Sequence, residues 1–91
     1  MGGLAMTFRD VNNSGVDFVL VDLDLGMTFM DVAETSRVAE TTSRNQNNAR
    51  RAYDAVLRLS EKLKLSPSQR QAIDAKLPVL KARLQAVGQQ F

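Results

Sequence analysis

The sequence of 91 residues contains no cysteine, no histidine and no tryptophan. Without cysteine, the chain can form no disulfide, no thiolate metal site and no thiol nucleophile. Without histidine, it lacks both the commonest general base and the commonest zinc ligand. These absences exclude many ordinary catalytic and metal-binding arrangements, so we expect a protein that is not an enzyme and that holds no cofactor or metal.

Long hydrophobic runs are also missing. No segment reaches the roughly 18–20 uninterrupted apolar residues of a membrane-spanning helix, and the N-terminus lacks the basic and apolar regions of a signal peptide. Apolar residues make up 44% and charged residues 24% of the chain, as in ordinary folded domains. We therefore expect one small cytoplasmic domain with no membrane partner.

The last element has the clearest boundaries. Ser66 is a typical N-cap, Pro67 suits the first helical position and Gln69 completes a capping box. Gly88 supplies a C-terminal stop. Apolar residues recur at helical spacing between these signals, at Ile73, Leu77, Leu80, Leu84 and Val87. The pattern predicts one helix at about 67–87, kinked at Pro78, which removes a backbone hydrogen bond.

The middle of the chain has a second amphipathic pattern. Its apolar positions are Ala49, Ala52, Tyr53, Val56, Leu59 and Leu63. This spacing predicts a helix at about 43–64, and residues 34–42 form the connector before it. Tyr53 has two interpretations, a core aromatic residue or a partner contact.

Residues 18–26, F-V-L-V-D-L-D-L-G, fit two kinds of element. The alternation of apolar residues with Asp22 and Asp24 fits a strand. A longer pattern fits a helix at about 17–33, with one stripe at Phe18, Val21, Leu25, Phe29 and Val32 and a second at Val19, Leu23, Met27 and Met30. No segment in 35–91 reads as a strand that could pair with this one, so the helix is favoured. Gly26 costs that helix about 1 kcal/mol relative to alanine and is typical of a close helix crossing.

Together these segments predict an all-α fold. Residues 1–16 would form a flexible N-terminal arm, and 17–91 a three-helix bundle made of an antiparallel hairpin and a closing C-terminal helix. The first helix has more apolar surface than such a bundle needs. We expect the surplus to meet a partner, and the possible partner surface is Leu23, Met27, Met30 and Tyr53.

Charge is unevenly distributed. Residues 1–34 carry one basic and six acidic groups, a net charge of −5, whereas residues 35–91 carry eleven basic and four acidic groups, a net charge of +7. Either the acidic segment lies along the basic one, or the basic half meets an acidic partner such as nucleic acid.

The aspartates of V-L-V-D-L-D-L-G superficially resemble the first motif of haloacid dehalogenase-like phosphatases. Those enzymes need a small turn residue where Leu25 stands, and a parallel sheet that 91 residues with three helical segments cannot supply. On a helix, moreover, Asp22 and Asp24 point about 200° apart, so they cannot share an ion or a proton. Solvated faces of an amphipathic helix explain them better.

Two short patterns resemble tetratricopeptide repeats. Leu25-Gly26-x2-Phe29 is similar to the first-helix signature of the repeat, and Ala49-x3-Tyr53 to the second. The resemblance covers about residues 18–63 and implies one antiparallel helix pair, with Gly26 allowing a close approach.

Three amphipathic helices without a catalytic constellation favour a non-enzymatic interaction or adaptor module. Because the bundle is small, we expect it to self-associate, as a homodimer or another homo-oligomer. The alternative is a small basic nucleic-acid-binding protein, which rests on the positive C-terminal half.

Overall fold

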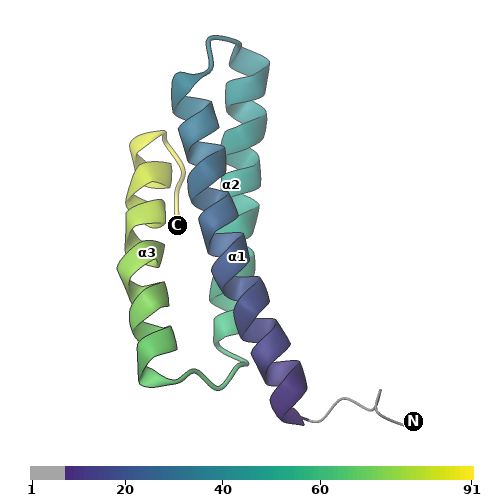
Figure 1. Ribbon diagram of the computed structural model, residues 1–91. Helices are drawn as coiled ribbons and strands as arrows, with labels where there is room; N and C mark the ends of the chain where they lie inside the picture. The colour runs from purple at the N-terminus through teal and green to yellow at the C-terminus, as the bar shows by residue number, and fades with distance from the viewer. Residues whose placement is uncertain (1–7) are drawn as a thin grey trace, which may run out of the picture.

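Three helices account for most of the chain in the computed structural model, which describes residues 8–91, and their side chains from residue 11 onward. They are α1 (Phe8–Thr35), α2 (Ala39–Ser60) and α3 (Pro67–Ala86). Figure 1 shows α1 and α2 as an antiparallel hairpin, with α3 packed beside it. The predicted all-α bundle is confirmed.

The flexible arm is a wrong prediction for residues 8–16, which belong to α1; residues 1–7 lie outside the described part. Val16 is buried. Asn12 forms two hydrogen bonds with the backbone of Lys64: its Oδ1 accepts from the amide at 2.8 Å, and its Nδ2 donates to the carbonyl at 2.9 Å. These tertiary contacts order a segment whose asparagines and Gly15 are weak helix formers.

The boundaries of the other helices lie close to the predicted ones. The chain between α1 and α2 is only 36–38, because α2 begins at Ala39 and not near residue 43. The capping box at Ser66 is present: its Oγ accepts from the Gln69 amide at 3.2 Å, and Gln69 Oε1 accepts from the Ser66 amide at 2.8 Å. Gly88 ends α3 with a φ of 94°, where a side chain would be strained. α3 continues through Pro78, which lies on its exposed face.

The inward face of α1 is the second of the two predicted stripes. Its members recur every three or four residues and all are buried, namely Val16, Val19, Leu23, Gly26, Met30 and Ala33. They pack against buried residues of α2 and α3, including Ala49, Val56, Ile73, Leu80 and Leu84. The stripe that contains Phe18 and Leu25 faces outward.

The reason for this choice of face is the crossing at Gly26. A Cβ atom built there would lie 2.8 Å from Leu80 Cδ2 and 3.3 Å from Ala52 Cβ. Where the three helices meet, a side chain on α1 would therefore have to displace the end of Leu80 and press against Ala52. Because Gly26 is in phase with Leu23 and Met30, these residues turn inward together.

Ion pairs join the acidic α1 to the basic α3. Lys76 Nζ lies 2.7 Å from Asp24 Oδ1, and Arg83 Nη2 lies 2.8 Å from Asp31 Oδ1 and 2.9 Å from Glu34 Oε2. The hydrogen bond to Glu34, and then that to Asp31, raises the pKa of Arg83 above its ordinary value, although burial opposes the shift. The first reading of the charge asymmetry, that the acidic segment lies along the basic one, is confirmed at these positions.

The C-terminal residues fold back on α2. The Phe91 ring meets Tyr53 edge to face, with centroids 5.0 Å apart, and lies 3.8 Å below Arg50 Cζ. Arg50 Nη1 also donates to the carbonyl of Gln90 at 2.7 Å. Tyr53 thus has an aromatic neighbour from its own chain.

Candidate interaction surface

The residues predicted as a partner surface lie mostly in the core. Leu23 and Met30 are fully buried and Tyr53 is only 6% exposed, so these three are wrong as surface residues. Met27 is half-buried beside Arg83, whose Nη1 lies 3.4 Å from its carbonyl oxygen. The prediction that α1 has surplus apolar surface is right in kind, but that surface is on the opposite stripe.

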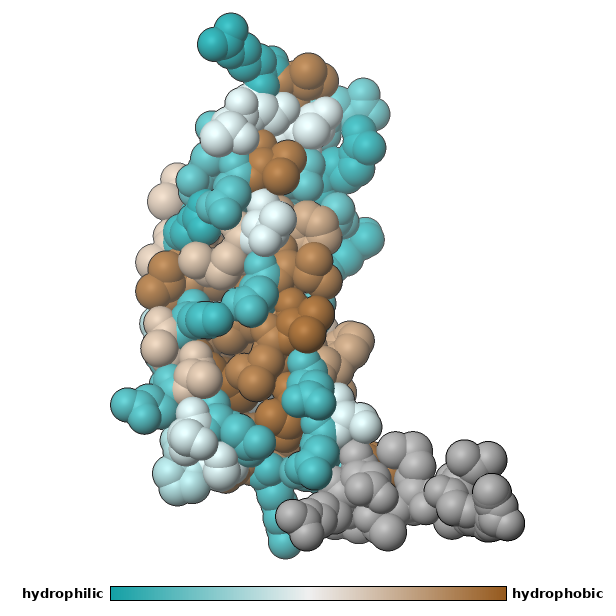
Figure 2. All heavy atoms as spheres, in the orientation of Figure 1, coloured by the Kyte–Doolittle hydropathy of each residue, from teal (hydrophilic) through white to brown (hydrophobic). Residues whose placement is uncertain are grey.

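The surplus forms a band along α1 that we call the outward stripe, defined as Val11, Phe18, Val21, Leu25 and Val32. Each of these side chains is between 41% and 60% exposed. Figure 2 shows apolar side chains gathered along this face of the molecule. Despite this apolar surface, none of the helices in 8–91 is long and apolar enough to span a membrane.

The outward stripe has heptad spacing. Val11, Phe18, Leu25 and Val32 are seven residues apart, as the a positions of a coiled coil would be, and Ser14, Val21 and Thr28 occupy the d positions between them. A helix with this repeat presents a continuous seam to a partner helix. α1 therefore has two seams, one for its own bundle and one that faces solvent.

Charged residues follow both edges of the outward stripe at the same period. The edge toward α3 carries Asp17, Asp24 and Asp31, which we call the aspartate edge. On the other side of the seam, across the α1–α2 groove, α2 carries Arg44, Arg51 and Arg58, which we call the arginine edge. All six of these side chains are exposed. The seam is thus acidic on one side and basic on the other.

The two edges also match in height along the bundle. Asn12 is level with Lys64, and Gly26 is level with Ala49 and Ala52, which fixes the antiparallel register of α1 and α2. By this register, Arg44, Arg51 and Arg58 lie at about the levels of Asp31, Asp24 and Asp17, within one to two residues or about 1.5–3 Å. Each arginine therefore has an aspartate at its own height on the far side of the seam.

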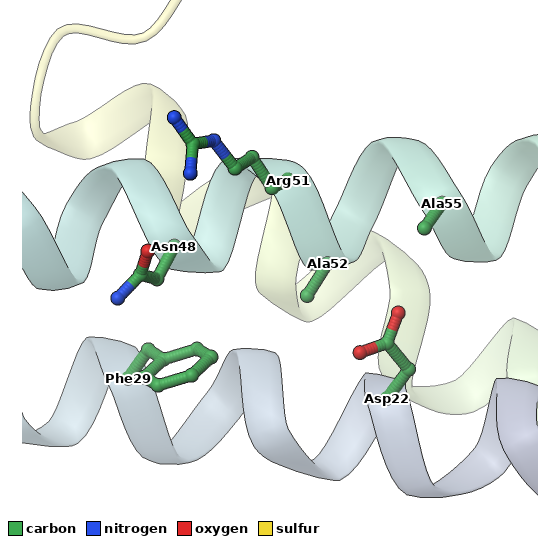
Figure 3. Close-up of a pocket in the computed structure, with 6 residues that line it drawn as sticks. All are labelled: Asp22, Phe29, Asn48, Arg51, Ala52 and Ala55. Carbon is green, nitrogen blue, oxygen red and sulfur yellow. The ribbon is translucent and has the colours of Figure 1, made fainter.

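A shallow groove separates α1 from α2 beside the seam. It has a volume of about 380 Å³ and is lined by Asp22, Phe29, Asn48, Arg51, Ala52 and Ala55. Figure 3 shows Asp22 and Phe29 pointing from α1 toward α2, whereas Arg51 extends along α2 and away from α1. The lining is mixed: Phe29, Ala52 and Ala55 extend the apolar surface of the outward stripe toward α2, and Asp22, Asn48 and Arg51 are polar.

Asp22 is half-buried on the side of α1 that faces α2. Burial against α2 raises its pKa above the ordinary value, because removing water disfavours the charged carboxylate. Asp24 instead faces α3, where Lys76 pairs with it. The two aspartates of the D-x-D motif thus lie on different sides of α1, and the side chains described, from residue 11 onward, include no cluster of three or more acidic groups that could hold a metal ion.

We expect Asp22→Asn to stabilise the protein at neutral pH and not at acid pH. A carboxyl whose pKa is higher in the folded than in the unfolded state favours folding when protonated, and this benefit is lost as the pH rises through its folded pKa. The neutral amide avoids the loss, so its melting temperature should exceed that of the parent by a few degrees at pH 7, with the gap closing in acid. Thermal unfolding followed by circular dichroism measures this; Asp74→Asn on the exposed side of α3 is the control. A constant gap across pH would contradict the expectation.

The sequence contains a signal that distinguishes the two stripes of α1. Gly26 is in phase with Val19, Leu23 and Met30, so recognising it as a helix crossing would have placed that stripe inside. The prediction instead placed the surplus apolar surface at Leu23, Met27 and Met30, on the stripe that contains Gly26. The heptad repeat of aspartates and arginines is visible in the sequence too, but its meaning depends on the register of α1 and α2.

Comparisons with models of protein families, with curated proteins and with solved structures give no match to this chain.

Proposed function

We propose that this protein is a non-enzymatic interaction module that docks a helix on the outward stripe of α1 and that self-associates through it. The observation that carries the proposal is the exposure of Val11, Phe18, Val21, Leu25 and Val32 at heptad spacing. A large contiguous apolar surface on a folded domain usually marks a site of association. Covering this surface with a partner contributes a favourable free energy of roughly 25 cal/mol for each Å² of apolar area removed from water.

The geometry of the outward stripe favours a helical partner. A seam with a period of 3.5 residues accepts the side chains of a second helix as knobs between its own. The half-buried Phe29 and the groove beside it add apolar contact on the side of α2. Thr28 Oγ1 donates to the carbonyl of Asp24 at 3.1 Å, so this d-position hydroxyl is satisfied within its own helix when a partner covers it.

The distribution of basic groups supports a protein partner over a nucleic acid. Lys76 and Arg83 pair with carboxylates of α1, and Arg50 pairs with Asp54 at 3.1 Å. Nucleic-acid binding relies on basic side chains free to neutralise phosphates. Part of the positive charge of the C-terminal half is thus neutralised by carboxylates of the same chain.

Photo-crosslinking tests the docking face. A benzophenone amino acid replaces Val21 on the outward stripe or, as a control, Ala75 on the exposed side of α3, and the protein is irradiated both purified and in cells that produce it. We expect covalent adducts, with its own copy or with another protein, from position 21 and not from position 75. Leu25→Asp should abolish them. Equal yields at the two positions would contradict the proposal.

A further inference from the structure

We propose that the occupant of the outward stripe is a second copy of this chain, and that two α1 helices pack parallel and in register about a two-fold axis. This inference rests on the proposed function and specifies its partner and geometry. It is carried by three features together: the heptad seam, the opposite charges of its two edges, and the matched heights of those edges.

The seam can pack against itself in register. Around a two-fold axis parallel to the helices, each layer pairs identical residues, so Phe18 meets Phe18 and Leu25 meets Leu25 of the second copy. Valine at a positions favours two-stranded packing, and both ends of the seam carry one, Val11 and Val32. Phe18 and Leu25 form the two middle a layers, and Val21 forms the apolar d layer between them.

The charged edges select the parallel arrangement. In a parallel pair, the g edge of one helix lies beside the e edge of the other. The aspartate edge of one copy therefore lies next to the α2 side of its partner. There the e positions of α1 are Gly15, Asp22 and Phe29, and the arginine edge stands behind them on α2, so Arg51 and Arg58 must offset Asp22 as well as the aspartate edge. Since the two edges match in height, Arg58 faces Asp17 of the second copy, and Arg51 faces Asp24. Both contacts occur twice because of the two-fold axis.

The aspartates can accept these additional partners. Although Asp24 pairs with Lys76, its side chain remains 63% exposed, and that of Asp31 remains 70% exposed beside Arg83. Arg51 and Arg58 form no ion pair with any residue in the described part of the chain, and both are exposed. Arg44 lies 4.0 Å from Glu40 in a loose surface pair. Each arginine can therefore turn toward the seam.

The antiparallel arrangement has the opposite charge pattern. It places g edges beside each other, so Asp17 and Asp24 of one copy would approach Asp31 and Asp24 of the other. Neighbouring carboxylates repel each other. The arginine edges of the two copies would lie far apart, on the outer sides of the pair. The apolar layers would be poorer too, because a positions face d positions in an antiparallel pair, which brings Phe18 and Leu25 against Ser14, Val21 or Thr28. Charge and apolar contact thus both favour the parallel direction.

Disulfide trapping tests the geometry directly, because the parent chain has no cysteine. The single variants Val11→Cys and Val32→Cys lie at opposite ends of the seam. A parallel, in-register dimer gives a disulfide-linked homodimer with each variant alone. An antiparallel dimer gives little disulfide-linked homodimer with either variant alone, but a disulfide-linked heterodimer when the two variants are mixed. That result would overturn the proposal. Ala75→Cys on α3 is the control for random collision.

Light scattering after size-exclusion chromatography measures the equilibrium. The parent should dimerise with increasing concentration, and Leu25→Asp should weaken dimerisation about 100-fold. Since Leu25 is 44% exposed in the bundle, this variant should keep the helical circular dichroism of the parent. Arg58→Asp should weaken the dimer about tenfold at low salt, adding Asp17→Arg should restore it, and Arg70→Asp on α3 should change nothing.

Two outcomes separate this inference from the proposed function. A parent that stays monomeric at high concentration, while position 21 still crosslinks to another protein, overturns the dimer and leaves the interaction module standing. A monomer whose Arg51 and Arg58 bind duplex DNA or RNA, with binding lost on their replacement by glutamine, overturns both. A concentration-dependent dimer with the disulfides of the parallel register supports both.

Discussion

Leu80→Ala lowers the free energy of unfolding by about 3 kcal/mol. Leu80 is fully buried where α3 meets the other two helices, and its Cδ2 lies over the backbone of Gly26. Removing three carbon atoms there leaves a cavity, because α1 has no side chain at position 26 that could move into it. For a domain with a stability of roughly 5–15 kcal/mol, this loss is large.

Urea unfolding of the monomeric Leu25→Asp background measures this loss without a contribution from association. Val79→Ala is the matched control, since the neighbouring Val79 is 47% exposed and its truncation should cost less than about 1 kcal/mol. If the two substitutions cost the same, Leu80 does not hold α3 against the hairpin as its burial indicates.

Gly26→Val lowers the free energy of unfolding by about 2–3 kcal/mol, although valine is a better helix former than glycine. The first carbon of the new side chain would lie 2.8 Å from Leu80 Cδ2 and 3.3 Å from Ala52 Cβ. Leu80 is buried, so its δ-methyl group can shift only by repacking within the core, and Ala52 Cβ is bonded directly to the α2 backbone, so it can yield only if α2 moves. Urea unfolding in the same background measures the effect.

Gly15→Val is the control, because it makes the same change eleven residues earlier on α1. A Cβ atom at position 15 meets only Leu63, whose Cδ2 lies 2.7 Å away at the end of a half-buried side chain just past α2. That side chain can turn aside, so we expect a change within about 1 kcal/mol. Equal losses at positions 15 and 26 would contradict the tight crossing.

The two expected losses should not add. In the Leu80→Ala background, the cavity accepts part of the valine at position 26, so the double variant should be more stable than the sum of the single effects predicts, by about 1 kcal/mol. Strict additivity would mean that residues 26 and 80 do not share one space.

How far the sequence predicts this protein differs from helix to helix. The start and end of α3 were predictable because Ser66, Gln69 and Gly88 act through local hydrogen bonds, and these are present. The start of α1 was not, because residues 8–16 are held by contacts with residues far along the chain, such as Lys64.

The candidate site was predictable in kind but not in position. The surplus of apolar residues on the first helix is visible in the sequence, and the structure confirms that α1 has more of them than its core uses. Both stripes of α1 have helical spacing, so periodicity alone could not choose between them. Which stripe faces the core depends on the space available for a side chain at the Gly26 crossing, and a hydrophobicity pattern contains no information about that space.

The pair formed by Asn12 and Lys64 has a consequence for the order of events during synthesis. The two residues are 52 positions apart, and ribosomes add about 5–20 residues per second, so Asn12 waits roughly 3–10 s for its partner to be made. Throughout this time the beginning of α1 lacks the contact that orders it, although it is the first described part of the chain to be made. α1 is thus the first helix to be synthesised, but its first residues gain the contact that orders them only after the segment between α2 and α3 has been made.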